Sequence, residues 1–148
     1  KKKKKNDSLI DFHIKLVKKL KNAGVPMVAG KDSGTSGIVW GFSLHDELKL
    51  LVDAGLTTNE VLISATRLPA EWLEIDDKIG TVEKGKFADL ILLDENPLKN
   101  INNTKKIAGV FVNGKWVSRE QLDNMLSVLA KENDLKKDDF DWNKRGDY

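Results

Sequence analysis

The sequence predicts an α/β protein made of two parts. Near the N-terminus, an amphipathic helix, a very short turn and an apolar strand at residues 25–30 follow one another, which is the order of an αβ repeat. Near the C-terminus, Asn113-Gly114 lies between two apolar runs, which is the pattern of a β-hairpin. With 148 residues, the chain is long enough for a hydrophobic core. We expect residues 7–75 to form the first part and residues 79–117 the second.

The first helix is predicted to start at Asp7 or Ser8 and to stop at Gly24, a common residue type at a helix end. Apolar side chains recur on one face of this helix, and lysines cover the other. Residues 25–30 are apolar on both faces of the predicted strand, which favours a parallel sheet covered on both sides. Residues 31–43 are rich in glycine and hydroxyl side chains, so we expect a flexible βα loop, a common place for functional residues.

Three shorter helices are predicted after this loop. Ser43 is the expected N-cap of the first, which covers residues 44–54. Thr57 and Glu60 have the spacing of a capping box and should begin the second. Pro69 is typical of a first helical position and should begin the third. The first part therefore has the predicted order αβααα.

The second part is predicted to be a small β unit followed by a helix. Apolar runs at 87–93, 107–112 and 115–117 are the expected strands, and a capping box begins a helix over 118–133. The tail at 134–148 mixes acids and bases, and we expect it to be disordered or draped over a surface. Three or four strands are too few to close a sandwich without further sequence or a partner.

Composition excludes several kinds of site and partner. The chain has no cysteine, so disulfides and thiolate metal sites are excluded. Net charge is only +2, and the lysine-rich start has no aromatic residues among its lysines, so we expect no nucleic-acid partner. No apolar run reaches the roughly 18 residues of a membrane span, so no membrane partner is expected. The compartment stays open, and we favour the cytoplasm.

Several segments carry a resemblance to a known enzyme family. They are residues 24–34, residues 43–57 and the run from Ile79 to Asp94, whose centre reads Gly-x-x-x-x-Gly-x-x-Ala-Asp. In this order they resemble the C-terminal portion of a metal-dependent amidohydrolase, closest to the imidazolonepropionase-like and prolidase-like subgroup. The resemblance covers roughly residues 10–117.

The resemblance implies the C-terminal part of a β/α (TIM-type) barrel, followed by part of a small β-sandwich and a C-terminal helix. Residues 7–75 would be the barrel segment, with 25–30 as its last strand. Residues 79–117 would be the C-terminal strands of the composite sandwich domain. The helix at 118–133 and the tail at 134–148 would follow.

The resemblance also assigns a role to Asp32. This residue matches the acid after the last barrel strand, which ligates the catalytic metal and accepts a proton from the attacking water. We therefore predict Asp32 as catalytic residue and metal ligand. By residue type alone, the favoured interpretation of Asp32 is a turn with Ser33 and Gly34, and the resemblance reverses this preference for the parent protein. Lys31 stands where the family usually has a small hydroxyl residue, and a cation facing the metal would oppose its binding.

The other metal ligands of the family are a His-x-His pair, later histidines and often a carboxylated lysine. This chain has only two histidines, His13 and His45, and they do not form such a pair. Zinc sites normally need three or four protein ligands. We therefore expect a divalent metal, with zinc favoured, in a full-length parent protein and an incomplete site in this chain. His45 is a candidate substrate contact or a structural histidine, and His13 is expected to pack.

These observations predict a C-terminal fragment of a metal-dependent hydrolase that acts on C–N bonds. The substrate would be a small amide, a cyclic amide or a dipeptide-like molecule. The fragment alone is expected to be inactive, and to associate with the missing N-terminal part or with further copies of itself. The alternative is a non-catalytic binding or assembly module that has kept a hydrolase-derived fold. An upstream His-x-His in the same reading frame would favour the enzyme fragment.

Overall fold

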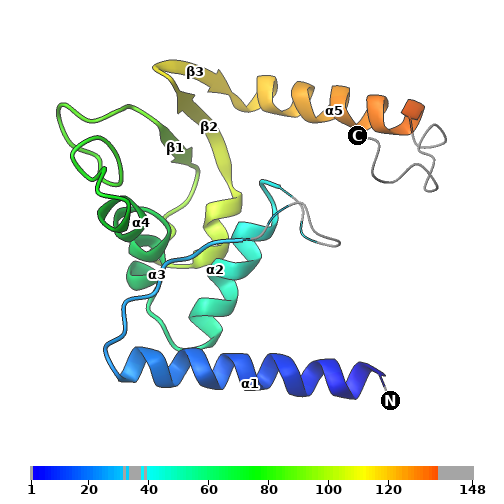
Figure 1. Ribbon diagram of the computed structural model, residues 1–148. Coiled ribbons are helices and arrows are strands. Elements are labelled where there is room, and N and C mark those ends of the chain that lie inside the picture. The colour runs from blue at the N-terminus through cyan, green and yellow to red at the C-terminus, as the bar shows by residue number, and fades with distance from the viewer. Residues whose placement is uncertain (1, 32, 34–37, 39, 137–148) are drawn as a thin grey trace, which may run out of the picture.

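The computed structural model describes residues 2–31, 33, 38 and 40–136. Figure 1 shows α1 lying along one side of the molecule, α2 to α4 in the middle, and the sheet on the opposite side, from which α5 extends. The elements are α1 (Lys2–Asn22), α2 (Ser43–Asp53), α3 (Thr58–Ala65), α4 (Arg67–Trp72), β1 (Leu90–Leu93), the 3₁₀ helix η1 (Ile101–Lys105), β2 (Ile107–Val112), β3 (Lys115–Ser118) and α5 (Arg119–Lys136).

A small hydrophobic core lies where α2, α3 and η1 meet. Leu48 of α2, Val61 of α3 and Ile101 of η1 are almost fully buried there, together with Leu56 from the α2–α3 turn. The core therefore joins the helical part of the chain to the segment that leads into β2. Partly buried side chains from α1, from the 25–30 segment and from α2 and α3 pack around it, namely Val17, Met27, Ala29, Leu51, Val52, Leu62 and Ala65.

The predicted capping box at the start of α3 is confirmed. The Glu60 backbone N–H donates to Thr57 Oγ1 at 3.2 Å, and Glu60 Oε2 accepts from the Thr57 backbone N–H at 2.6 Å. Lys21 of α1 adds an ion pair to the same carboxylate at 3.0 Å. This single acid therefore caps α3 and ties it to α1.

Three predicted helix starts are wrong. α1 begins at Lys2 rather than at Asp7 or Ser8, because the polar residues before the predicted cap continue the helix. α2 begins at Ser43 itself, and Phe42 occupies the N-cap position without a side-chain cap hydrogen bond. Phe42 already has helical φ and ψ of −105° and −45°, so the chain enters the helix one residue earlier than predicted. α4 begins at Arg67, two residues before Pro69. Proline fits in a first turn because the N–H groups there have no acceptor within the helix.

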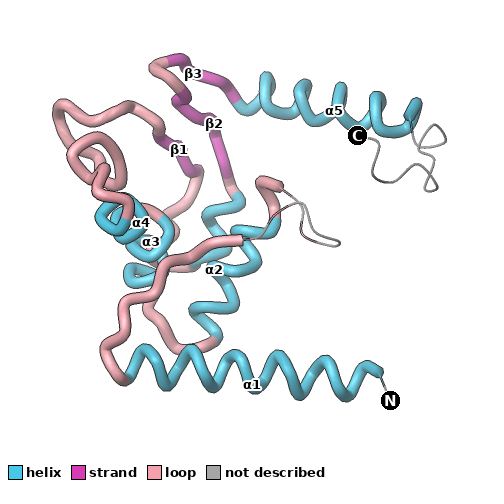
Figure 2. Tube along the Cα trace, in the orientation of Figure 1, coloured by secondary structure: helices cyan, strands magenta, loops and turns pink. Residues whose placement is uncertain are grey.

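The strand predicted at 25–30 is absent, and Figure 2 shows this segment as a loop. The sheet formed by the described residues has the order β1-β2-β3, and the 25–30 segment is not part of it. Instead, the Ala29 N–H donates to the Ser64 carbonyl of α3 at 2.9 Å. A strand requires a neighbouring strand for its backbone hydrogen bonds, so an apolar pattern alone does not create one.

The C-terminal β unit agrees with the predicted hairpin. β1, β2 and β3 are antiparallel neighbours, and Val110 lies opposite Val117. Asn113 and Gly114 both have positive φ, 51° and 73°, as the tight turn between β2 and β3 requires. β1 is shorter than predicted and starts at Leu90. The predicted capping box of α5 is also present: the Ser118 N–H donates to Gln121 Oε1 at 2.8 Å, and the Gln121 N–H donates to Ser118 Oγ at 3.3 Å.

Gly109 in β2 generates the first prediction. A Cβ atom there would collide with the Trp116 ring and approach the Val117 carbonyl oxygen to 2.8 Å. The Trp116 ring also packs on Phe111, with centroids 4.9 Å apart. We expect Gly109→Ala to displace this ring and to lower the free energy of unfolding by about 1–3 kcal/mol, measured by urea denaturation. Gly30→Ala is the control, because a Cβ at Gly30 meets no atom within 4 Å.

Glu60 generates a prediction about pH. Hydrogen bonds from the Thr57 backbone, then from the Lys21 and Thr57 side chains, lower its pKa from 4.5 to about 2. A carboxyl group with a lowered folded-state pKa stabilises the fold above its unfolded pKa and loses this contribution as the pH falls. Glu60→Gln should therefore destabilise the chain at pH 6, and its deficit relative to wild type should shrink between pH 4.5 and 2. The deficit is measured by urea titrations across this pH range, with Glu132→Gln as the control. A deficit that stayed constant would contradict the prediction.

Candidate functional site

The candidate site surrounds the loop between the 25–30 segment and α2. Two backbone groups fix the entry to this loop: the Ala29 N–H donates to the Ser64 carbonyl, and the Gly30 N–H donates to Glu47 Oε1 at 3.3 Å. At the exit, the His45 N–H donates to the Phe42 carbonyl at 3.2 Å. The predicted metal ligand Asp32 lies outside the described residues, so its role stays a prediction.

His45 is held between α2 and η1. Its Nδ1 atom lies 3.0 Å from Thr104 Oγ1, and the Thr104 hydroxyl donates its hydrogen to the Ile101 carbonyl at 2.8 Å. A hydroxyl has only one hydrogen, so with that hydrogen on the Ile101 carbonyl we assign the donor role in this pair to Nδ1, and Nε2 then carries no proton in the neutral ring. Burial, and then the positive charge of Lys105, lower the pKa of His45, while Asp46 acts in the opposite direction. Burial and the charge of Lys105 both favour the neutral form of the imidazole.

A second contact joins α2 to η1, and it is made by the residues that directly follow His45 and Thr104 in the sequence. Lys105 Nζ lies 2.8 Å from Asp46 Oδ1, and both side chains are exposed. The hydrogen bond and the charge of Lys105 lower the pKa of Asp46, and the charge of Lys31 adds to this effect. The lysine that departs from the family pattern is thus close enough to favour the ionised form of Asp46. An exposed pair of this kind contributes little to stability.

Sequence reasoning identified His45 but missed its partners. Thr104 and Lys105 lie in a polar segment that carries no motif, 59 residues from their partners in α2. Glu47 also belongs to no motif, and nothing in the sequence indicates its contact with Gly30. The predicted role of His45 as a substrate contact stays a prediction. Its Nδ1 atom contacts Thr104 within the protein, so a substrate would have to bind at Nε2.

The described residues do not form a metal cage. Among them, no group of three or more His, Asp or Glu side chains is placed to hold an ion. In the described part of the chain, no helix combines the length and apolar character needed to cross a membrane.

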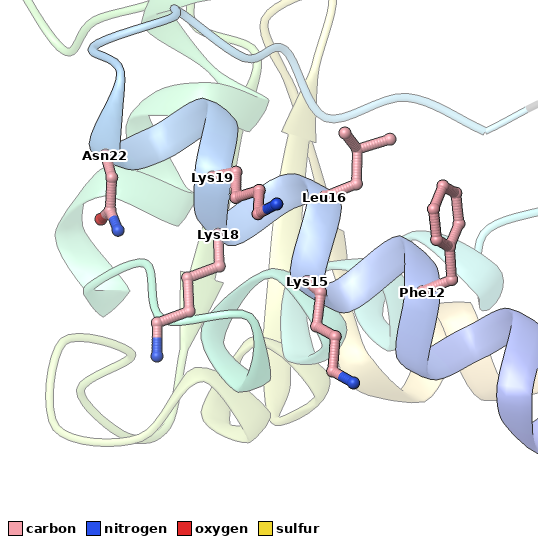
Figure 3. Close-up of a pocket in the computed structure, with 6 residues that line it drawn as sticks. All are labelled: Phe12, Lys15, Leu16, Lys18, Lys19 and Asn22. Carbon is pink, nitrogen blue, oxygen red and sulfur yellow. The ribbon is translucent and has the colours of Figure 1, made fainter.

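Two surface depressions lie away from this loop. One, of about 380 Å³, is lined entirely by α1, and Figure 3 shows Phe12 and Leu16 pointing to one side of the helix while Lys15 and Lys18 point to the other. These side chains do not converge on a common point, so this surface lacks the arrangement of a catalytic site. The second, of about 470 Å³, lies between the 25–30 segment and α4 and is lined by Pro26, Val28, Leu68, Glu71 and Trp72.

Comparisons with known proteins agree with the predicted resemblance. The chain matches the amidohydrolase family over residues 3–117. The 5'-deoxyadenosine deaminase of Methanobrevibacter smithii is 46% identical over 54 residues, which make up 36% of this chain and 12% of the deaminase. The prediction of an amidohydrolase-type chain is therefore confirmed.

Solved structures that resemble this chain include hydrolases. A Xaa-Pro dipeptidase with methionine bound in its active site matches with a TM-score of 0.65 and 28% identity, over 71% of this chain and 25% of the dipeptidase. Phenylurea hydrolase B matches with a TM-score of 0.64 and 26% identity, over 70% of this chain and 26% of the hydrolase. The matched region thus spans about a quarter of the length of these structures.

The contact between His45 and Thr104 generates the third prediction. Thr104→Val keeps the side-chain shape but removes the acceptor of the Nδ1–H bond, so we expect a loss of about 1 kcal/mol in the free energy of unfolding. Thr104→Ser keeps the hydroxyl and is the matched control. In ¹⁵N NMR, the wild-type and Thr104→Ser chains should show a proton on Nδ1 at neutral pH and a His45 pKa below 6.5. A neutral ring protonated on Nε2 in the wild type would contradict the assignment.

Proposed function

Because the chain belongs to the amidohydrolase family, we propose that it is the C-terminal part of an enzyme that hydrolyses a C–N bond. The observation that carries the proposal is the family match across residues 3–117, which includes the 25–30 segment and the loop with Asp32. The similar solved structures include a dipeptidase and a phenylurea hydrolase. The proposed substrates are accordingly small amides, cyclic amides or dipeptide-like molecules.

In this proposal, Asp32 is a metal ligand and the proton shuttle. A carboxylate at that position can accept the proton of the attacking water and pass it to the leaving nitrogen. The chemistry that a bound divalent ion, zinc in our proposal, supplies in such sites is a water of lowered pKa and a polarised carbonyl. The remaining ligands would come from the rest of the parent protein, because this chain has only two histidines and no His-x-His pair. His45, neutral and with Nε2 free of a proton, would contact the substrate.

The 148-residue chain alone is proposed to lack turnover and to bind no metal tightly. Its surface supports an association with the rest of the parent or, as the second possibility, with further copies of itself. Val28 is 46% exposed and Trp72 is 77% exposed, and both line the depression between the 25–30 segment and α4. Leu9 and Phe12 of α1 are also more than half exposed, at 55% and 60%. Apolar surface of this extent is typical of an interface.

The same exposed surface also supports the alternative of a non-catalytic assembly module with a hydrolase-derived fold. The two proposals differ in the coding sequence that they expect before Lys1. An enzyme fragment requires further metal ligands, a His-x-His pair among them, in the same reading frame. A start codon next to Lys1 would favour the assembly module.

The fourth prediction tests Asp32 in the full-length protein. Asp32→Asn removes the negative charge needed for metal binding and proton transfer, so we expect turnover to fall about 10²–10⁴-fold. Bound zinc, measured by mass spectrometry after dialysis, should fall as well. Asp76→Asn, which changes an exposed carboxylate elsewhere in the chain, should leave both quantities unchanged. Full activity and zinc content in Asp32→Asn, or turnover by the 148-residue chain alone, would contradict the proposal.

A further inference from the structure

Glu47, on α2, connects this helix to the end of the 25–30 segment. Its Oε1 atom accepts a hydrogen bond from the Gly30 backbone N–H at 3.3 Å. Its Oε2 atom is buried and has no hydrogen-bond partner among the described residues. The side chain as a whole is half-buried, which sets it apart from the exposed Asp46 beside it.

The burial of Glu47 Oε2 without a hydrogen-bond donor among the described residues lowers the stability of the fold. A buried carboxylate oxygen without a donor has lost its water and gained nothing in return. Natural proteins tolerate such local conflicts chiefly at functional sites. Among the described residues, the hydrogen bond from Gly30 is the one that this carboxylate accepts.

The bond fixes the backbone at the entry to the loop. The 25–30 segment has no strand beside it in the described part of the chain, so no sheet ladder holds its end in place. Ala29 is held by the Ser64 carbonyl at 2.9 Å, and Gly30 by Glu47. Gly30 carries no side chain that could anchor it by packing. Its backbone position therefore depends on Glu47, and Asp32 follows two residues later in the sequence.

We propose that Glu47 is a positioning residue that fixes the backbone of Gly30 and thereby the start of the loop that carries Asp32. This inference rests on the proposed function of Asp32. Glu47 acts through the backbone and has no proposed contact with metal or substrate. Residues that orient metal ligands from outside the coordination sphere typically change metal affinity by 10- to 100-fold when they are mutated.

The structural half of the proposal is tested by amide hydrogen exchange, measured by NMR on the 148-residue chain. In Glu47→Ala, we expect the exchange of the Gly30 amide to accelerate about tenfold, because its acceptor is gone. Glu47→Gln keeps an acceptor oxygen and should restore near wild-type exchange. The Ala29 amide, bonded to Ser64, is an internal reference that should not change in either variant.

Asp53→Ala is the matched control, because it removes a carboxylate from the same helix that pairs only with Lys49 among the described residues. If Glu47→Ala does not fold, Glu47→Asp replaces it in the test. This variant keeps the charge, but its side chain is one methylene shorter. We therefore expect the Gly30 amide to exchange faster and the Ala29 amide to exchange as in the wild type. Unchanged exchange at Gly30 in the folded variant would overturn the proposal.

The functional half is tested in the full-length protein by competing zinc away with a chelator. We expect Glu47→Ala to weaken zinc binding at least about tenfold, Glu47→Gln to recover most of it, and Asp53→Ala to have no effect. Asp32→Asn is the reference variant. If Asp32→Asn leaves zinc binding unchanged, the proposed function fails while the exchange result at Gly30 still stands. If Asp32→Asn weakens binding and Glu47→Ala does not, the positioning role is overturned.

Discussion

The contact between α2 and η1 is the interaction on which the rest of the structure depends. Leu48 and Ile101 are 4% exposed and lie in one cluster with Val61, although 53 residues separate them in the sequence. Burying such side chains stabilises a fold by about 1.5–3 kcal/mol each. Once these residues pack, His45 comes to lie beside Thr104, and Asp46 beside Lys105. The polar contacts next to the candidate site thus follow from an apolar one.

This core is small for the length of the chain. Among the described hydrophobic residues, Leu48, Ala54, Leu56, Val61, Ala70 and Ile101 are fully buried, whereas many larger side chains face outward. A protein interior normally holds most of its large aliphatic and aromatic residues. Apolar surface of this extent has the character of an interface. The matched region spans about a quarter of the length of its solved relatives.

Local patterns determined what the sequence could predict. The hairpin at Asn113-Gly114 and the capping box of Thr57 and Glu60 depend on residues at most three positions apart, and the structure contains both. The strand at 25–30 depends on neighbours that the described chain does not supply, and it is absent. The partners of His45 and Glu47 could not be predicted, because they depend on how α2 packs in three dimensions. The family was recognisable because its motifs are local.

Lys31, which stands where the family usually has a small hydroxyl residue, acts together with Lys105 on the Asp46 carboxylate at the first turn of α2. The charges of Lys105 and Lys31 both favour the ionised form of Asp46, and Lys105 also disfavours a proton on His45. The negative charge of Asp46 acts in the opposite direction on His45 and raises its pKa. Burial and the charge of Lys105 favour the neutral form of His45, whose Nδ1 atom contacts Thr104. With the ring proton assigned to Nδ1, the Nε2 atom of a neutral histidine can accept a hydrogen bond.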